Sequence, residues 1–492
     1  MKHLIALTVL LGAVLLASAA LADGGYYSGT LGSRATGRAG AFAAKADDLS
    51  AVSWNPAGLA NLDLTTFEIG NQTSYNAYAY TRAPTVDYGN TNTPLVTFSQ
   101  VKNGTPWQAF VPMLGAASRL GRKDWTFALA AYAPPGISKL SFPLGNGQND
   151  GQRYMMTDRE AIFLKYVASA AWKFHDVFGV GASAEWVNVP RLRYSLLIDG
   201  TDLAKAANPV TSPFDMKVTM QGSSLFTFNA IVGAWYRPTP SLMFGASGQV
   251  VPANVVAHST LSVTPLDPTY SDVTLWRGNV QANDVRVKLP LPLLARAGGR
   301  YVNRVNNLER FDVELDVEYV NWSRVQRFTI ETDGLSAYYS GRTVPLGTIT
   351  IEKHWRDTLA VRLGGDYAVL PGRLTLRAGG YYESAVAEPA YANVDFPGAA
   401  QMGGALGLSV FVRRFEVALA YMLKLQPSVS VAESDARVYQ QVPAGACTPP
   451  YNDPNTCNPN YPPGQPSPAV NAGTYSASSH MLSLSVLYRY GL

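Results

Sequence analysis

Residues Phe311 to Tyr319, with the sequence Phe-Asp-Val-Glu-Leu-Asp-Val-Glu-Tyr, alternate an apolar side chain with an acidic one at every step. In an extended chain, successive side chains point to opposite faces. The apolar residues therefore share one face and the carboxylates Asp312, Glu314, Asp316 and Glu318 share the other. This stretch predicts a β-strand with one apolar and one charged face.

The same period of two recurs later in the chain. Segments with this pattern are residues 359–367, 374–382, 415–424 and 482–492. Arg362 and Arg377 fall on the polar faces of two of them, so we expect the acidic ladder of residues 312–318 to be neutralised by cations on neighbouring strands. The alternation by itself suits any half-buried sheet, including a soluble β-sandwich.

The connections between these segments distinguish the two architectures. Short turns are predicted at residues 175–176, 239–241, 306–307, 371–372 and 413–414, and long loops at about 81–106, 136–157, 264–284 and 432–474. Transmembrane β-barrels combine short turns at one end with long loops at the other and an even number of strands. The sequence thus favours an all-β fold, a transmembrane antiparallel β-barrel of about 14 strands in residues 62–492.

The N-terminus has the composition of an export signal. Lys2 and His3 precede an apolar stretch from Leu4 to Ala17, and Ala20-Leu21-Ala22 is a small-x-small cleavage site. We expect a signal peptide over residues 1–22. A membrane anchor is the alternative, but the apolar stretch is shorter than the roughly 20 residues that a spanning helix needs.

Two cysteines, Cys447 and Cys457, lie in a Pro- and Asn-rich stretch near the C-terminus. Since an exported chain meets an oxidising compartment, we predict a disulfide between them. The five histidines are scattered singly, so the sequence gives no support for a metal site, and it implies no cofactor.

The segment ahead of the first strand, residues 23–61, is rich in Gly and Ala and does not alternate. It contains Gly37-Arg-Ala-Gly40, Ala46-Asp47-Asp48 and Asn55-Pro56-Ala57-Gly58-Leu59. Such a segment is either a floppy extension or a plug folded into the barrel. Asn-Pro is suited to fix a turn where backbone meets the wall.

These three motifs resemble the N-terminal hatch of the FadL/TodX family of outer-membrane transporters. Other matching segments follow in order, at residues 111–114, 133–137, 318–323, 355–358 and 376–379. The resemblance implies a hatch inside the lumen, marked by Asp47, Asp48, Asn55, Pro56 and Ala57. It also implies passive transport of long-chain fatty acids or aromatic hydrocarbons across the bacterial outer membrane.

The family further implies a route through the protein. Substrate is caught by apolar extracellular loops, passes to a site in the barrel, and leaves sideways through a kink in the third strand. The kink corresponds here to Pro134, Pro135 and Gly136, because proline cannot donate a ladder hydrogen bond; these residues could equally just end the strand. Candidate capture residues in the loop that follows are Ile137, Leu140, Phe142, Leu144, Met155 and Met156, which could instead pack as a loop core.

The remaining expectations concern partners and alternatives. We expect a monomer that contacts outer-membrane lipid and lipopolysaccharide, is inserted by the barrel assembly machinery, and binds no nucleic acid. An unpaired inward Arg or Lys beside an apolar pocket would anchor a substrate carboxylate. A general porin and an adhesin are the alternatives; an enzyme is not expected, because no Gly-x-Ser-x-Gly motif or paired histidines occur.

Overall fold

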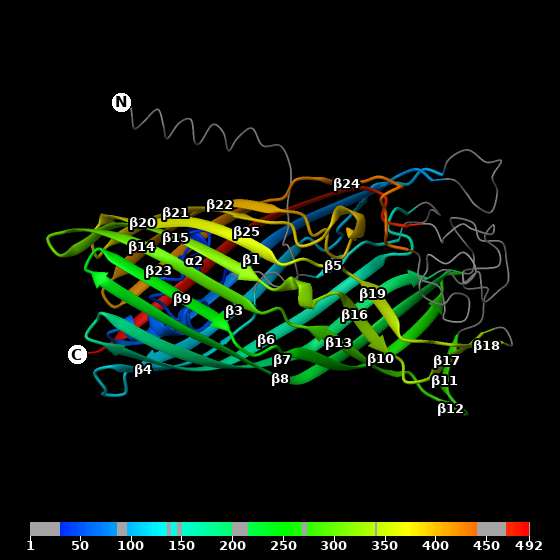
Figure 1. Cartoon of the computed structure of the whole chain (residues 1–492), viewed down its shortest axis with the longest axis horizontal. Helices are drawn as coiled ribbons and strands as arrows, with labels where there is room; N and C mark the ends of the chain where they lie inside the picture. Colours follow the sequence, from blue (N-terminus) through cyan, green and yellow to red (C-terminus); the bar gives the residue numbers. More distant parts are fainter. Residues whose placement is uncertain are drawn as a thin grey trace.

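The computed structural model describes residues 30–85, 96–134, 139–144, 150–198, 215–267, 273–339, 342–439 and 469–491. These residues form a closed antiparallel β-barrel with 14 spanning strands, which lies lengthwise in Figure 1. The first and last strands close the barrel by pairing from Thr65 with Tyr490 to Arg82 with Gly473. The predicted fold class is therefore confirmed.

Seven spanning strands are continuous in the described residues, and seven are built from two pieces. The continuous strands are β1 (Thr65–Arg82), β6 (Met156–Phe174), β7 (Phe178–Ile198), β8 (Met216–Thr239), β21 (Leu374–Glu383), β22 (Gln401–Val412) and β25 (Gly473–Tyr490). The two-piece strands are β2 (Val101–Lys102) with β3 (Trp107–Ser118), β4 (Trp125–Tyr132) with β5 (Leu140–Ser141), β9 (Leu242–Gln249) with β10 (Asn254–Pro265), β13 (Asp284–Pro290) with β14 (Leu294–Val305), β15 (Leu308–Val320) with β16 (Arg327–Glu331), β19 (Ile349–Glu352) with β20 (Thr358–Leu370), and β23 (Phe415–Leu425) with β24 (Val429–Val431).

Tight turns join the strands at one end of the barrel, here called the turn end. His175 and Asp176 both have positive φ, as do Asn306 and Asn307, which is the type I′ geometry that suits two-residue hairpins. Longer connections gather at the opposite end, the loop end. One predicted loop, residues 264–284, contains two short strands there, because β11 (Thr274–Arg277) and β12 (Val280–Gln281) form a small sheet with β17 (Leu335–Tyr339) and β18 (Arg342–Pro345).

The predicted strand at residues 311–319 lies within β15 and shows how the two faces are used. Val313 and Leu315 on its outer face are 45% and 52% exposed, whereas Glu314 on its inner face is fully buried in the lumen. The barrel thus turns its apolar face outward, the opposite of a soluble sandwich.

Two rings of aromatic side chains mark the boundaries of the apolar outer surface. On five strands an outward aromatic residue near the turn end is followed by another eight positions away: Phe67 and Tyr75, Phe174 and Tyr166, Phe178 and Trp186, Tyr236 and Phe228, and Phe311 and Tyr319. Eight residues span about 26 Å along a strand, which fits the apolar band of a bilayer between its aromatic girdles.

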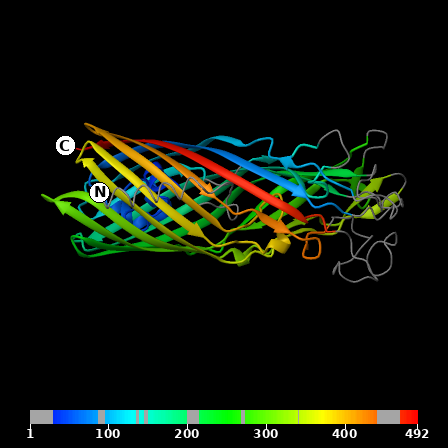
Figure 2. The same cartoon turned by 90° about the horizontal axis from the view of Figure 1, so that it is seen from above.

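Beyond the ring nearer the loop end, several strands break. β15 ends at Val320, one residue after Tyr319, and the chain passes through a short 3₁₀ helix, η2 (Trp322–Arg324), before β16. A further 3₁₀ helix, η3 (Pro389–Tyr391), precedes β22. Because β6, β7 and β8 run on without interruption, the wall extends past the apolar band on that side as a narrower structure (Figure 2).

The described part of the expected hatch, residues 30–61, lies inside the barrel near the turn end (Figures 1 and 2). It folds into two short α-helices and a 3₁₀ helix, α2 (Ser33–Gly37), α3 (Ala51–Trp54) and η1 (Pro56–Asn61). Nearly all its side chains are buried, and Phe42 and Trp54 are among the largest fully buried ones. No helix among the described residues is long and apolar enough to cross a membrane.

Candidate functional site

The hatch is tied to the barrel by ion pairs with the acidic ladder of β15. The Arg38 guanidinium contacts the carboxylates of Asp312 at 2.6 Å and Glu314 at 2.9 Å, and also that of Asp366 on β20. Lys45 Nζ lies 2.8 Å from Asp312. All of these groups are buried or nearly so, and buried ion pairs of this kind cost several kcal/mol to break by removing one partner.

Backbone amides of the hatch use the same ladder. The amides of Phe42 and Ala43 donate to Asp316 Oδ2, and that of Ala44 donates to Glu314 Oε1 at 2.7 Å. The expected neutralisation across strands holds for Glu318, which pairs with Arg296 and Arg362. For Asp312, Glu314 and Asp316 the expectation is incomplete, because much of their charge is satisfied by the hatch.

Glycines in the wall leave room for the hatch backbone. A Cβ at Gly233 would lie less than 3.0 Å from Asn55 Oδ1, and one at Gly379 would lie as close to the Arg38 carbonyl. Asn55 caps η1 by accepting from the Ala57 amide, and its Nδ2 donates to the carbonyls of Ala43 and Ala234. The Asn-Pro-Ala motif therefore contacts the wall directly.

The paired acidic residues of the hatch have different surroundings. Arg34 and Lys45 outweigh burial and lower the pKa of Asp47 to about 2. Asp48 is fully buried, and burial raises its pKa, only partly offset by Arg34 and Ser50. Asp48 Oδ2 and Glu68 Oε1 on β1 are both buried without a hydrogen-bond partner among the described residues.

Asp48→Asn is expected to stabilise the protein at neutral pH. A carboxyl whose pKa is raised by folding loses stability as the pH rises from its ordinary pKa through the raised one. An amide avoids this loss and keeps an acceptor for the Ser50 amide. Thermal unfolding in detergent should show a higher Tm for Asp48→Asn and a lower one for the control Asp47→Asn, which loses the pair with Arg34. A lower Tm for Asp48→Asn would contradict this assignment.

The wall has a gap beside the third strand. β4 pairs with β3 only from Ser118 to Met113 and with β6 only from Trp172 to Lys165. β3 continues to Trp107, and β5 resumes pairing with β6 at Arg159. Among the described residues, 107–112 of β3 and 160–164 of β6 thus have no ladder partner on the sides that face each other, apart from the Ala133 amide, which donates to the Pro112 carbonyl. Pro134, at this break, is buried, while Pro135 and Gly136 lie outside the described residues.

The end of β4 is fixed by a buried polar cluster. The hydroxyl of Tyr132, its last residue, donates to Glu185 Oε1 at 2.8 Å, and Lys165 Nζ contacts Glu185 Oε2 at 2.8 Å. Asn229 Nδ2 donates to the same carboxylate. The cluster spans β4, β6, β7 and β8, so it holds these strands together below the gap.

An inner cavity of about 60 Å³ lies beyond the apolar band, toward the loop end. Apolar side chains such as Phe163, Met220 and Phe328 line it, and Arg159 is the charged one among its described lining residues. Arg159 Nη1 donates to the Asp395 carbonyl at 2.9 Å, and its guanidinium lies 4.0 Å from the centre of the Phe396 ring. The lining therefore combines apolar side chains with one cation.

A second cation, Lys353, lies next to residues that line this cavity, Phe328 and Phe396. Lys353 Nζ forms an ion pair with Asp395, which also accepts from the Tyr194 hydroxyl at 3.0 Å. Burial lowers the pKa of Lys353, and Asp395 partly offsets that effect. The carboxylate of Asp395 thus serves Lys353 and Tyr194, while Arg159 lines the cavity itself.

An outer cavity of about 70 Å³ shares Tyr194 and Ile351 with the inner one. Two predicted capture residues, Met155 and Met156, line it together with loop residues that include Val438 and Tyr439. Met155 and Met156 belong to a cluster of buried apolar residues that also contains Leu140 and Phe142, and Leu144 packs against this cluster. These loop residues therefore form a core in this structure, and Ile137 lies outside the described residues.

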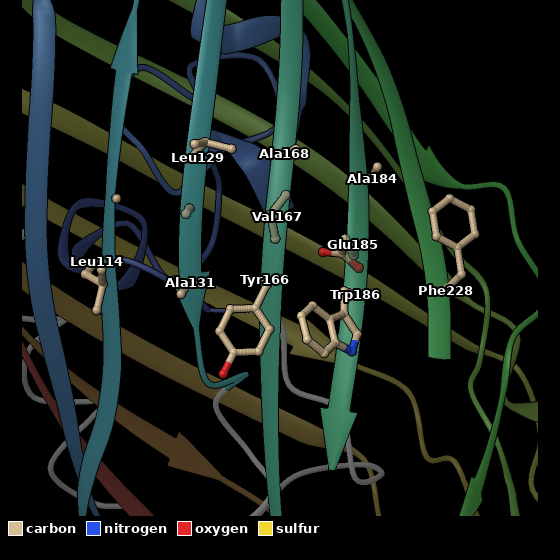
Figure 3. A pocket seen from close by; sticks show the side chains of 12 residues that line it. Leu114, Leu129, Ala131, Tyr166, Val167, Ala168, Ala184, Glu185, Trp186 and Phe228 are labelled. Atoms are coloured by element: carbon tan, nitrogen blue, oxygen red, sulfur yellow. The ribbon is translucent and has the colours of Figure 1, made fainter. Parts of the chain in front are cut away.

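A groove of about 510 Å³ runs over the outer face of the wall next to the gap (Figure 3). It crosses β3, β4, β6, β7 and β8, and Tyr166 and Trp186 lie side by side along it with their ring centres 5.0 Å apart. This groove could not be predicted from the sequence, since it depends on which outward residues the neighbouring strands bring into one row.

Sequence reasoning also missed the inner cavity. Arg159, Lys353 and Asp395 are far apart in the chain, and none belongs to a local motif. Cys447 and Cys457 lie outside the described residues. Among the described residues, no group of three or more His, Cys, Asp or Glu is placed to hold a metal ion.

Comparisons with known proteins show which family this barrel belongs to. The family model described as outer membrane protein transport protein (OMPP1/FadL/TodX) matches residues 13–446. No curated protein sequence matches the chain. The fold is similar to that of a FadL homologue from Pseudomonas aeruginosa, with 17% identity, a TM-score of 0.71, and 95% of this chain and 100% of that one covered.

Two hydrocarbon transporters have a similar fold. For the toluene transporter TbuX of Ralstonia pickettii the identity is 16% and the TM-score 0.59, with 94% and 99% of the two chains covered. For the toluene transporter TodX of P. putida the identity is 15% and the TM-score 0.59, with 90% and 95% covered. The family consists of transport channels rather than enzymes. By the extent of the family match and the hatch-filled barrel together, this chain belongs to the OMPP1/FadL/TodX family of outer membrane transport proteins.

Proposed function

We propose that this protein carries long-chain fatty acids passively across the bacterial outer membrane. The observation that supports this substrate class most directly is the inner cavity, where Arg159 is the charged group among apolar lining residues. A carboxylate can pair with the guanidinium while the methylenes next to it contact the apolar side chains of the lining. A hydrocarbon without a charge would form no ion pair with Arg159.

The proposed route has three steps. Substrate enters among the loops through the outer cavity at Met155 and Met156, and moves past Tyr194 into the inner cavity. It then leaves sideways through the gap between β3 and β6. Lateral exit keeps the tail out of water, which would otherwise cost about 0.8 kcal/mol per methylene.

In this proposal the hatch closes the lumen and does not leave it. Its ion pairs with β15 and its close contacts with wall glycines hold it below the gap. The loop residues Leu140, Phe142 and Leu144 support the walls of the capture region rather than touching substrate first.

Uptake in cells that lack their own carrier tests the function. Cells producing this protein should take up labelled oleate, and a variant deleted from Asp23 to Leu59 should lose that saturable uptake. Labelled toluene is the comparison substrate. Faster uptake of toluene than of oleate would replace fatty acids by hydrocarbons as the substrate, and uptake of neither by an inserted barrel would refute the proposal.

Arg159→Met is expected to raise the KM for oleate about tenfold, because a charge-assisted hydrogen bond contributes roughly 1.5–3 kcal/mol. Methionine keeps much of the apolar volume, so uptake of toluene or of an uncharged fatty alcohol should change little. Arg191→Met, on the same wall but outside the cavity, is the matched control. Equal effects on oleate and the alcohol would show a structural role for Arg159 instead.

A general porin is the alternative with a clear structural test. Porins need a water-filled lumen, which the hatch occupies here. Liposomes containing the intact protein should therefore not swell in isotonic sugars. Rapid swelling would favour the porin, and binding of whole cells to host surfaces would favour an adhesin.

We also infer that the barrel acts as a monomer in contact with outer-membrane lipid and lipopolysaccharide after insertion by the barrel assembly machinery. Its closed strand order supports this inference, because the first and last strands of the barrel, β1 and β25, pair with each other along their whole length and not with a second copy. A mass measurement in lipid nanodiscs would show a dimer if the inference fails.

A further inference from the structure

The groove on the outer face of the wall begins where the gap ends. Strand register places Leu114, Ala131, Tyr166, Trp186 and Phe228 in one row across five strands. Ala131 is the last outward residue of β4 before the strand stops at Tyr132. Ala131 is smaller than its neighbours in the row, Leu114 and Tyr166. The outer surface is therefore lowest at Ala131, beside the gap.

The next row toward the turn end makes the floor. Register aligns Leu129 with Ala168 and Ala168 with Ala184. The two outward alanines lie in one row with Leu129, and the rings of Tyr166 and Trp186 lie beside this row on its loop-end side, as Figure 3 shows. The result is a hollow whose alanine floor lies lower than the larger side chains around it.

The chemistry of the groove is almost entirely hydrocarbon. Glu185 is the charged residue among its described lining residues, and its carboxylate is turned to Lys165, Tyr132 and Asn229 and fully buried. The Tyr166 hydroxyl points along the strands toward the loop end in Figure 3, which is the side of the membrane boundary. A bound amphiphile would thus keep its tail over the alanines and its head near that boundary.

We propose that this groove is a docking site for the hydrocarbon tail of the substrate as it leaves through the gap. The inference rests on the proposed function. Its support is continuity: the groove adjoins the opening at Ala131, so a tail can slide from the gap onto Ala168 and Ala184 without meeting water. A concave apolar surface contacts one chain on three sides, whereas a flat wall contacts it on one.

The occupant is the substrate rather than a fixed membrane lipid because the groove and the gap meet. A bilayer lipid in the groove would lie across the opening and obstruct it. The volume of about 510 Å³ is within the range of sites for single small-molecule ligands. The groove therefore shortens the step from the lumen into the membrane.

Filling the groove tests this proposal. Ala168→Phe with Ala184→Phe places two rings on the floor, and Ala297→Phe, at an outward exposed alanine of β14, is the matched control. The filled variant should take up oleate about fivefold more slowly than the wild type, since the tail loses its contacts along the floor. Binding of oleate to the purified filled variant should be unchanged, because the inner cavity is intact.

Photolabelling identifies the occupant. A fatty acid carrying a diazirine at its terminal carbon, added from outside to liposomes, should label peptides containing Ala168 and Ala184 more than those containing Ala297. A phospholipid with the same diazirine, placed in the bilayer beforehand, should label all three positions alike.

The outcomes separate this inference from the proposed function. If the wild type transports oleate but the filled variant transports it equally fast, the docking site is overturned and the transport proposal stands. If phospholipid labels the groove selectively, the occupant is a membrane lipid. If the wild type transports no oleate, the proposed function itself fails.

Discussion

Replacing Arg38 with Met is expected to release the hatch from the barrel wall and make the closed barrel leak. The substitution leaves Asp312 with Lys45 and Arg300, but removes the cation that joins Asp312, Glu314 and Asp366. Removing one member of a buried ion network costs about 3–5 kcal/mol. That is large compared with the other single contacts between the hatch and the wall.

Liposome swelling with small sugars measures the leak, and limited proteolysis measures exposure of the hatch. The variant should show both, with residues near Lys45 cleaved, while the barrel strands stay protected. Arg310→Met is the matched control, because Arg310 lies on β15, the strand that carries Asp312 and Glu314, and contacts Tyr367 and the Ala368 carbonyl rather than the hatch. An Arg38→Met protein that neither leaks nor is cleaved would show that the glycine contacts alone retain the hatch.

Sealing the wall gap is expected to abolish transport while leaving substrate binding intact. Changing Ala133-Pro134-Pro135-Gly136 to Val-Thr-Val-Thr restores backbone donors and favours extended structure. β4 could then continue between residues 107–112 of β3 and 160–164 of β6. Uptake of oleate should fall by more than about tenfold, because the tail would have to cross a complete hydrogen-bonded wall.

The control uses another proline-interrupted strand. Pro290→Thr with Pro292→Thr alters the break between β13 and β14, which does not border the gap. This variant should transport oleate at nearly the wild-type rate, and both proteins should bind oleate in detergent with wild-type affinity. Unchanged uptake by the sealed variant, with a strand at residues 133–136 shown by hydrogen exchange, would remove the gap from the route.

The predicted strands and the observed ones agree where burial is one-sided. In β15 and β23 successive residues face the lipid and the lumen in turn. Apolar and polar residues therefore alternate with a period of two in the sequence. Past the aromatic ring near the loop end the burial still alternates, but the apolar face turns inward. There β10, β13 and β16 meet water outside and an apolar interior, and residues 264–284 were expected to be a loop although two strands form within them.

The hatch motif was predictable, but its binding partners were not. Asn55 and Pro56 indicated a fixed turn, and they do contact the wall. Arg38 gave no comparable signal, because its three carboxylate partners come from strands more than 270 residues later. For the same reason Arg159 and Asp395 could not be paired from the sequence, since only the closed barrel brings them together.

The hatch contacts also set the order in which the protein can be completed. Residues 30–61 are made first, yet the amides of Phe42 and Ala43 find their acceptor 274 and 273 positions later, on β15. Contacts that distant form late in folding. The barrel closes only when the final strand, β25, pairs with β1. The hatch must therefore already lie inside the curved sheet before this last pairing forms. A barrel that closed with its hatch outside would leave an open pore in the outer membrane. Errors in assembly would then harm the cell more than errors in transport.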